Sequence, residues 1–401
     1  MGGGVLVFIL LINISILLIT NNQTKGKNTV LTGKIASNQN TMALYINDDG
    51  GYKKSESIPT SGYKLNTEKS YCSIDDKKDT SIALEYSNGK INVKNLTKKG
   101  TKCYLYFDKN YQTVESILAS KTIATRSDFS TTLTTDTTGT IYSAEDDYGT
   151  SYYYAGNPSD NWVKFAGFYW RIIRINGDGT IRMIYNGPTT DQTGETTQIG
   201  KSAFNSTYDD NMYVGYQYTS AEVHGRGTDS TIKQALDNWY SNNLKSYSSY
   251  IATGNGANFC NDRQPSTDSS TINGDGGTGT TQTYYAPYIR LVTNKVPSLK
   301  CTDGGDRFTT SVGLITADEV AYAGGVAGAS NSSYYLCTNQ YYWSMSPFNF
   351  DGNYAHLFFI NSSGDLLNYE NSIPGVRPVI NLKSNTVFVG SGFSFDPYIV
   401  S

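Results

Sequence analysis

The chain has 401 residues, a formal net charge of -3 and only 17% charged residues, whereas Tyr (33 residues) and Gly (39 residues) are abundant. No stripe of Lys and Arg is present to neutralise a phosphate backbone, so nucleic-acid binding is not expected. The length suffices for two or three domains, and a composition rich in Tyr, Ser, Gly and Asn is typical of binding surfaces.

Residues 5–19 form an almost unbroken apolar run without a charged side chain. As a helix with about 1.5 Å rise per residue, the run spans less than the roughly 30 Å hydrocarbon core of a bilayer. A signal-peptide core and a membrane anchor both remain open, and the poor cleavage site at residues 21–25 favours the anchor. We expect residues 1–20 to target the chain to a membrane and the rest to be extracellular, either anchored at the cell surface or secreted.

The chain contains five cysteines, which are Cys72, Cys103, Cys260, Cys301 and Cys337. None forms a C-x-x-C motif and only two histidines are present, so a Cys/His zinc site is not expected. In an exported chain, cysteines usually pair. We expect disulfides between Cys72 and Cys103 and between Cys260 and Cys301, which leaves Cys337 free. A Cys301–Cys337 bridge is the alternative to the second pair.

Between residues 28 and 120, apolar side chains alternate with polar ones, which is the period of β-strands. The alternating sets are Ile82, Leu84 and Tyr86, then Ile91 and Val93, then Cys103, Leu105 and Phe107. Asn88 and Gly89 predict a tight hairpin turn. We expect a small disulfide-linked β-sandwich that ends in a short helix over residues 113–120. Residues 121–140 are rich in Ser and Thr and are expected to form a linker.

The second domain is expected over residues 141–401. Residues 168–175 and 180–185 are rich in β-branched and aromatic side chains and flank a Gly-containing turn, which predicts a hairpin. Two helix starts follow, one with a capping box at Thr231 and Gln234 and one at Thr316 and Glu319. Near the end, two strand-like runs meet at a polar turn over residues 361–364, and a third run follows the motif G-V-R-P at 375–378. These three runs are expected to form one closing sheet.

Several motifs that suggest chemistry lack the required context. The G-x-G-x-x-G match at residues 274–279 lies in a polar loop, and the phosphate-loop-like residues 194–202 have one residue too many between the glycines. We expect His356 to be a hydrogen-bonded structural histidine in a strand and His224 to be an exposed loop residue. Carboxylates at 145–147, at 209–210 and at Asp303 with Asp306 could bind calcium, but none has calcium-loop spacing. No cofactor is therefore expected.

Two charged residues are expected to have structural roles. Asp262 follows Cys260 closely and should pair with an arginine. Arg377 precedes a proline, which holds it extended and aims its side chain across the sheet. In a domain so poor in charge, a buried guanidinium needs an internal partner, and Asp318 or Glu319 is expected to supply it.

Residues 142–382 resemble uncharacterised bacterial cell-surface proteins with a domain of the formylglycine-generating-enzyme/sulfatase-modifying-factor fold, a relative of the C-type lectin fold. The matching motifs are F-A-G (165–167) with W-R-I-I (170–173), L-D-N-W-Y (236–240), F-C-N-D-R (259–263), G-L-I-T-A-D-E (313–319), and W-S-M-S-P (343–347) with G-V-R-P (375–378). The resemblance implies an irregular, β-rich α+β domain with a structural Trp343. The reactive cysteine pair of the oxidase members has no match, and the calcium signatures of the lectins are also absent, so no activity carries over.

The favoured hypothesis is a non-enzymatic, adhesin-like surface protein that binds glycan or protein on another cell or in the envelope. Tyrosine-rich segments motivate it, because aromatic faces stack on sugars, although the same rings could instead line the core. The candidate contact residues are Tyr152, Tyr153, Tyr284 and Tyr341. An extracytoplasmic enzyme that uses Asp262, Glu319 and His356 for acid–base chemistry is the alternative. A purely structural envelope component is the third hypothesis.

Overall fold

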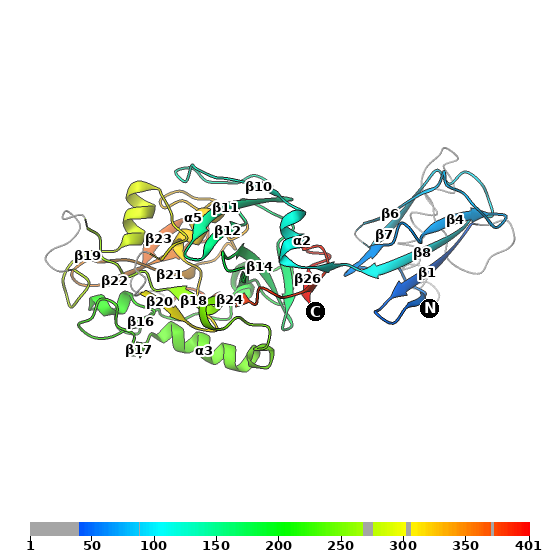
Figure 1. The fold of residues 1–401 in the computed structure, drawn as a ribbon. Coiled ribbons are helices and arrows are strands. Elements are labelled where there is room, and N and C mark those ends of the chain that lie inside the picture. The colour runs from blue at the N-terminus through cyan, green and yellow to red at the C-terminus, as the bar shows by residue number, and fades with distance from the viewer. Residues whose placement is uncertain (1–39, 88, 268–275, 302–305, 370–372) are drawn as a thin grey trace, which may run out of the picture. The chain divides into compact units, whose positions relative to one another are not determined.

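The structure, a computed structural model, describes residues 40–87, 89–267, 276–301, 306–369 and 373–401. The expected targeting segment 1–20, Asn88, Asp303 and the first part of the 274–279 motif lie outside the described residues. The chain divides into a smaller unit, Met1–Gln112 with Phe388–Ile399, and a larger unit, Thr113–Val387 with Val400–Ser401 (Figure 1). Within the described residues, no helix has the length and apolar character needed to span a membrane.

The smaller unit is built on a six-stranded sheet with the order β2-β1-β8-β4-β5, in which β3 also pairs with β8. Its strands are β1 (Thr41–Asn47), β2 (Tyr52–Ser55), β3 (Tyr63–Leu65), β4 (Tyr71–Ile74), β5 (Lys77–Lys78) and β8 (Lys102–Lys109). β1 and β8 are parallel, and the other pairs are antiparallel. Two further antiparallel pairs are β6 (Ala83–Ser87) with β7 (Lys90–Lys94), and β9 (Tyr111–Gln112) with β25 (Phe388–Val389).

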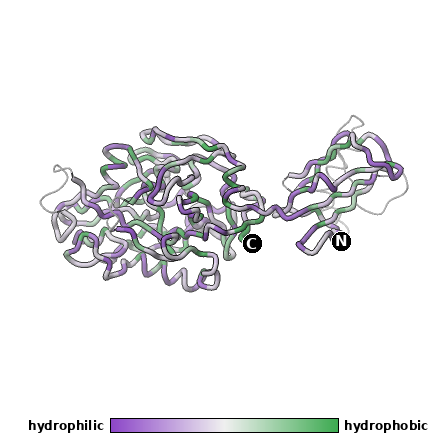
Figure 2. Tube along the Cα trace, in the orientation of Figure 1, coloured by the Kyte–Doolittle hydropathy of each residue, from purple (hydrophilic) through white to green (hydrophobic). Residues whose placement is uncertain are grey.

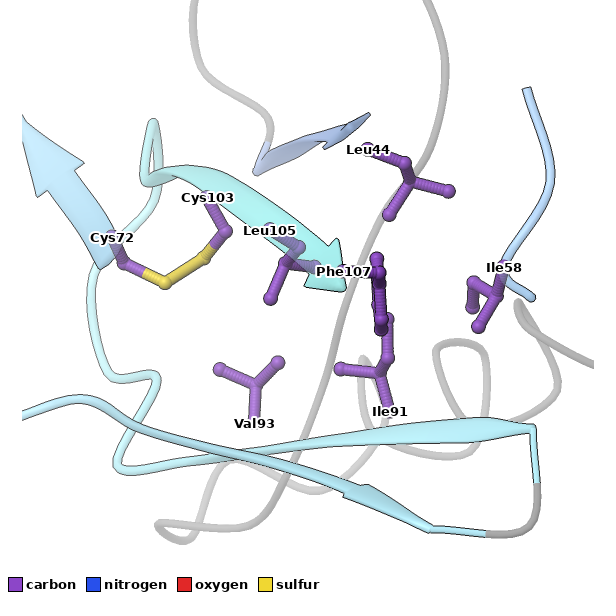
Figure 3. Packing of buried hydrophobic residues seen from close by; sticks show 8 residues of the cluster. All are labelled: Leu44, Ile58, Cys72, Ile91, Val93, Cys103, Leu105 and Phe107. Atoms are coloured by element: carbon purple, nitrogen blue, oxygen red, sulfur yellow. A yellow bond between two sulfur atoms is a disulfide. The ribbon is translucent and has the colours of Figure 1, made fainter. Parts of the chain in front are cut away.

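An apolar core lies between β8 and the β6–β7 hairpin (Figure 3). Leu105 and Phe107 of β8 are buried against Ile91 and Val93 of β7. Their alternation with polar neighbours follows from the two-residue period of strands, and hydrophilic and hydrophobic residues are interspersed along the strands of both units (Figure 2). The predicted β6–β7 hairpin and the inward face of β8 are confirmed.

The larger unit contains a curled sheet centred on β14, which pairs with β12, β13 and β15. β11 pairs with β10 and β12, and β15 pairs with β24. These strands are β10 (Thr122–Ala124), β11 (Thr140–Asp146), β12 (Gly149–Tyr153), β13 (Trp162–Phe165), β14 (Phe168–Ile175), β15 (Ile181–Tyr185) and β24 (Val379–Leu382). The predicted β14–β15 hairpin is confirmed, with a bulge between Ile172 and Arg174 that the sequence pattern did not indicate.

A second sheet has the order β19-β21-β22-β23, with strands β19 (Thr283–Tyr284), β21 (Tyr342–Phe350), β22 (Ala355–Ile360) and β23 (Leu366–Tyr369). The predicted hairpin around residues 361–364 is confirmed as β22–β23. The prediction of one closing sheet was wrong in its third strand, because β24 pairs with β15 of the first sheet. Short strands complete the unit: β16 (Gln217–Tyr218) with β17 (Thr228–Asp229), and β18 (Asn258–Cys260) with β20 (Arg307–Thr309). The last strand, β26 (Tyr398–Val400), has Tyr398 and Ile399 in the smaller unit and Val400 in the larger.

Helices are few and short. They are α2 (Val114–Ala119), α3 (Thr231–Asn243), α4 (Ala286–Tyr288) and α5 (Ala317–Ala323), with the 3₁₀ turns η1 (Gly194–Thr197), η2 (Asn211–Val214), η3 (Lys245–Tyr247) and η4 (Gly254–Ala257) and the π-turn η5 (Ile289–Asn294). The capping box of Thr316 and Glu319 at α5 is confirmed. The box predicted at Thr231 was wrong by one residue: Ser230 caps α3 by accepting from Lys233 N, and Thr231 Oγ1 accepts from Ser206 N instead.

The Ser/Thr-rich segment 121–140 differs from the expected linker. Its first part is β10, which pairs in parallel with β11. Further along, Arg126 donates to the carbonyl oxygens of Ala321 and Tyr322, and its guanidinium lies over the Phe129 ring. Phe129 and Leu133 pack against a buried cluster of the larger unit. One arginine and two apolar residues thus attach a segment whose composition alone indicated no packing.

Both expected disulfides are present. Cys72 is bonded to Cys103, its register partner between β4 and β8, at one end of the core in Figure 3. Cys260 is bonded to Cys301, so the alternative Cys301–Cys337 bridge was wrong and Cys337 is free. The chain is therefore β-rich, with curled sheets, few helices and two disulfides.

We predict that replacing Cys72 and Cys103 together by Ala lowers the free energy of unfolding of the smaller unit by about 3 to 4 kcal/mol. The bond closes a loop with a sequence separation of 31 residues, and its loss restores that entropy to the unfolded chain. Urea denaturation monitored in the presence and absence of reductant measures the change. Cys337→Ala is the control and should leave the transition unchanged; equal unfolding curves for the double variant and the wild type would contradict the prediction.

Candidate functional site

Two adjoining cavities in the larger unit form the candidate site. The inner one, named the Asp262 cavity, has a volume of about 60 Å³ and is lined largely by charged side chains. The second, named the outer cavity, has a volume of about 520 Å³. Asp147, Ser298, Lys300 and Cys301 line both, so the two spaces adjoin.

Four parts of the chain bring the charged groups together. β14 and β15 supply Arg174 and Arg182, and the first turn of α5 supplies Asp318 and Glu319. Asp262 follows β18, next to the Cys260–Cys301 disulfide, and Arg290 comes from η5. The disulfide ties the strand before Asp262 to the segment that carries Ser298 and Lys300, and so fixes one wall of both cavities.

Glu319 is the most highly connected carboxylate of the site. Oε1 lies 2.9 Å from Arg174 Nε and 2.5 Å from Arg182 Nε, and Oε2 accepts from Thr316 N at 2.9 Å. Burial by itself raises the pKa of Glu319, but the two guanidinium groups outweigh it and lower the pKa to about 2. Arg174 also donates to Asp146 Oδ2 at 2.8 Å. Glu319 therefore stays ionised at any physiological pH.

Arg290 joins the other two carboxylates. It donates to Asp318 through Nε at 2.8 Å and Nη2 at 2.7 Å, a bidentate contact, and Nη2 also contacts Asp262 Oδ2. Burial acts to lower the pKa of Arg290, but the two carboxylates outweigh it and raise the pKa. The expected pairing of Asp262 with an arginine is confirmed, and the partner is Arg290.

Asp262 is the unusual member of this network. Its backbone is left-handed, with φ 52°, a conformation that costs energy for a non-glycine residue and is often found at functional sites. Its side chain is 6% exposed, and Oδ1 has no hydrogen-bond partner among the described residues. Four carboxylates, those of Asp146, Asp262, Asp318 and Glu319, form ion pairs with the guanidinium groups of Arg174, Arg182 and Arg290. This network of seven groups has one formal negative charge in excess, and Asp262 Oδ1 is a buried acceptor within it.

The acid–base set proposed for an enzyme is not assembled. Asp262 and Glu319 line one cavity, whereas His356 lies on β22 with Nε2 3.3 Å from Asp351 Oδ2 and Nδ1 3.3 Å from Asn368 Nδ2. A carboxylate whose pKa is about 2 is a poor proton donor or acceptor near neutral pH. The arrangement is suited to holding a polar group in place rather than to moving a proton.

The four tyrosines selected as ligand contacts do not gather into one surface. Tyr153 was wrongly selected as a contact, because its ring is buried in the core against Tyr322 and Tyr142. Tyr152 is partly buried on β12. Tyr284 pairs with Asn349 near the end of β21, whereas Tyr341 immediately precedes that strand and is 47% exposed. At about 3.3 Å per residue, roughly 25 Å separates the last two.

The partner predicted for Arg377 was wrong. Arg377 is fully buried, but it donates to the carbonyls of Tyr185 and Leu336 and to Asn186 Oδ1, and its guanidinium lies over the Tyr342 ring. Asp318 and Glu319 are held by Arg290, Arg174 and Arg182 instead. An arginine can satisfy its five N–H groups with carbonyls and an aromatic face, so a carboxylate was not required.

Two smaller outcomes concern His224 and Trp343. His224 was expected to be an exposed loop residue, but its Nδ1 lies 2.8 Å from the buried Asp306 Oδ1. Trp343 is buried, with Nε1 donating to the carbonyl of Ser202 at 2.8 Å, as a structural tryptophan should.

The three arginines of the site were not predicted from the sequence. We did not predict a role for Arg174, Arg182 or Arg290. Arg174 and Arg182 stand in the predicted hairpin, and the capping box that contains two acidic residues lies far along the sequence, at 316–319. A buried strand that carries arginines in a charge-poor chain was the available signal, because such arginines need internal partners.

Within the described ranges, no group of three or more His, Cys, Asp or Glu side chains is arranged to hold a metal ion. Comparison of the chain with protein-family models, with curated proteins and with solved structures found no match.

We predict that Glu319→Gln lowers the free energy of unfolding by roughly 3 to 5 kcal/mol at pH 7, because Arg174 and Arg182 lose their shared negative charge. The pKa of Glu319 is lowered from 4.5 to about 2, so its charge stabilises the fold above pH 4.5. That contribution is lost as the pH falls through about 2, and the difference between variant and wild type should shrink accordingly.

Urea denaturation at a series of pH values tests this. The matched control is Glu195→Gln, since the Glu195 side chain is 61% exposed and its partners among the described residues are Lys201 and Gln340 at the surface. It should change stability little at any pH. A Glu319→Gln effect that is the same at pH 2.5 and pH 7 would show that Glu319 is not the ionised centre of the network.

Proposed function

We propose that the chain is an exported, non-enzymatic, adhesin-like protein whose larger unit binds a glycan in the outer cavity and the Asp262 cavity. The two disulfides support export, because such bonds persist in oxidising compartments. The apolar run at residues 5–19 supports membrane targeting, by anchoring or by secretion through a cleaved signal peptide. The ion-paired state of the acidic groups supports binding over catalysis.

The observation that carries the proposal is Asp262. Its left-handed backbone and its unpartnered, buried Oδ1 both cost free energy in the unbound protein. A ligand hydroxyl that donates to Oδ1 would satisfy this acceptor. The Asp262 cavity, at about 60 Å³, has room for one such group or for ordered water.

The outer cavity supplies space for the rest of the ligand. Its volume of about 520 Å³ lies in the range of small-molecule sites. Lys300 provides a donor on its wall, and Ile289, Ala286 and Pro265 provide apolar surface for the ring face of a sugar. A sugar, with hydroxyl donors and acceptors on a partly apolar ring, matches this mixture better than a wholly apolar ligand does.

For the larger unit, we also propose the sulfatase-modifying-factor or C-type-lectin-like type of domain. The support is the order of the motifs between residues 165 and 378. Three of them contribute to the candidate site: F-C-N-D-R contains Asp262, G-L-I-T-A-D-E contains Asp318 and Glu319, and W-R-I-I directly precedes Arg174.

We predict that two variants of the full chain, Ala286→Trp and Lys300→Glu, weaken glycan binding at least about tenfold while leaving the thermal unfolding temperature close to that of the wild type. The first fills the outer cavity with an indole ring, and the second reverses a charge on an exposed side chain that lines both cavities. A glycan array with the wild-type chain identifies the ligand, and calorimetry with that glycan measures the two variants.

Lys245→Glu is the matched control, because Lys245 is exposed in η3 and does not line either cavity. It should bind as the wild type does. If the array is negative and a protein is captured instead, with the same dependence on Ala286 and Lys300, the site is a protein-binding site. If no ligand of either kind binds, or if both variants bind normally, the proposal fails.

A further inference from the structure

A third cavity lies elsewhere in the larger unit and is named the Arg171 cavity. Its volume is about 330 Å³, and it shares no lining residue with the Asp262 cavity or the outer cavity. Hydroxyl and amide groups form much of its wall, contributed by Asn157, Thr190, Gln192, Thr193, Ser332 and Ser333. A cavity with such walls suits a small polar molecule that can hydrogen-bond in several directions.

Arg171 lines this cavity and is a buried cation that has no ion pair with a carboxylate among the described residues. The residue is 7% exposed, and its guanidinium lies 4.2 Å from the Trp162 ring centroid and 5.1 Å from that of Tyr335. Nε donates to Asn161 Oδ1 at 2.5 Å and Nη2 to the carbonyl of Pro158 at 2.6 Å. Burial lowers the pKa of Arg171 to about 9, which reflects how poorly its charge is solvated.

Asp160, whose charge acts on Arg171, is held by other groups. Its Oδ2 forms an ion pair with Lys121 at 2.5 Å and accepts from Gly139 N, its Oδ1 has no hydrogen-bond partner, and no ion pair joins it to Arg171 among the described residues. A second buried guanidinium, that of Arg377, lies near enough to lower the pKa of Arg171 further. Among the described residues, neither guanidinium forms an ion pair with a carboxylate, and burying a charge without such a partner is costly.

Two neutral donors stand beside Arg171 in the same wall. Thr338 is 5% exposed, and its Oγ1 has no hydrogen-bond partner among the residues the structure describes. Asn186 accepts at Oδ1 from Arg377 Nη2 at 2.9 Å, which orients its amide so that the NH₂ group remains to donate. Arg377 does not line the cavity, but it orients the Asn186 amide, which does.

We propose that the Arg171 cavity binds the carboxylate of a small acidic sugar, with the carboxylate on Arg171, Thr338 and Asn186 and the sugar hydroxyls on the surrounding polar wall. The Nη1–Nη2 edge of a guanidinium can donate two parallel hydrogen bonds to a carboxylate, a geometry that a lysine ammonium does not offer. The bound anion offsets the charge of the buried Arg171 guanidinium, and the unpartnered Thr338 hydroxyl gains an acceptor. This site is separate from the proposed glycan site and stands or falls independently of it.

The test uses the full chain, with sodium D-glucuronate as the probe, D-glucose as its uncharged counterpart and sodium sulfate as a bare anion, all at constant ionic strength. Binding is measured by calorimetry, and its location by the alkylation rate of Cys337, the free thiol, which lines the same cavity. Glucuronate should bind and slow the alkylation several-fold, whereas glucose should do neither.

The decisive variant is Thr338→Val, which is nearly isosteric. Because Oγ1 has no partner, its removal should leave the thermal unfolding temperature unchanged or raise it, yet weaken glucuronate binding about tenfold. The matched control is Thr386→Val outside the cavity, where Oγ1 donates to the carbonyl of Lys383 at 2.6 Å. It should lower the unfolding temperature and leave binding intact. This opposite pattern separates a role in binding from a role in folding.

Three results would overturn the proposal. Glucuronate that binds without slowing the alkylation of Cys337 is bound elsewhere. Sulfate that binds while glucuronate does not would show a site for a bare anion and not for an acidic sugar. If wild type and Thr338→Val bind glucuronate with equal affinity, the Thr338 hydroxyl does not contact the ligand, and Arg171 has a structural role only.

Discussion

The carboxylate of Glu319 is the point on which the larger unit depends. It caps the start of α5 through Thr316, and it holds Arg174 of β14 and Arg182 of β15, so one side chain fixes a helix to two neighbouring strands. The Arg182 guanidinium also lies over the Phe259 ring at 4.3 Å, which connects β18 to the same point. Removing one partner from such a buried set costs far more than the set adds to stability when intact. The ion pairs that hold α5 against β14 and β15 therefore also set the geometry of the candidate site.

Five largely buried arginines of the larger unit are accommodated in two ways. Arg174, Arg182 and Arg290 meet carboxylates, and the resulting network is nearly neutral. Arg171 and Arg377 meet carbonyls, amides and aromatic rings instead. The second solution satisfies the N–H groups but not the charge, since a ring face or a carbonyl offsets only part of a full positive charge. This difference separates a closed ion-pair network from the region for which we propose an anion site.

The sequence predicted local features well where a single local signal decided them. Alternation placed Leu105 and Phe107 in a core, the capping box placed the start of α5, and cysteine spacing with an expected oxidising environment gave both disulfides. Features that depend on contacts between distant parts of the chain could not be predicted from the sequence. The bulge after Ile172 shifts the register of β14 against β15, so counting residues along the strand did not indicate that Arg174 and Arg182 would converge on Glu319. Likewise, the proline after Arg377 predicted an extended backbone at that position, but it did not indicate which groups the buried guanidinium would contact.

The smaller unit has a consequence for the order in which the protein can fold. Its core residues and the Cys72–Cys103 bond all lie before residue 110, yet β9 pairs with β25, which follows Thr113–Val387 of the larger unit in the sequence. Contacts between such distant segments form late, because the intervening chain must first be closed into a loop. The smaller unit can therefore be completed only after Thr113–Val387 has been synthesised, and a truncation before Phe388 would remove β25 from it.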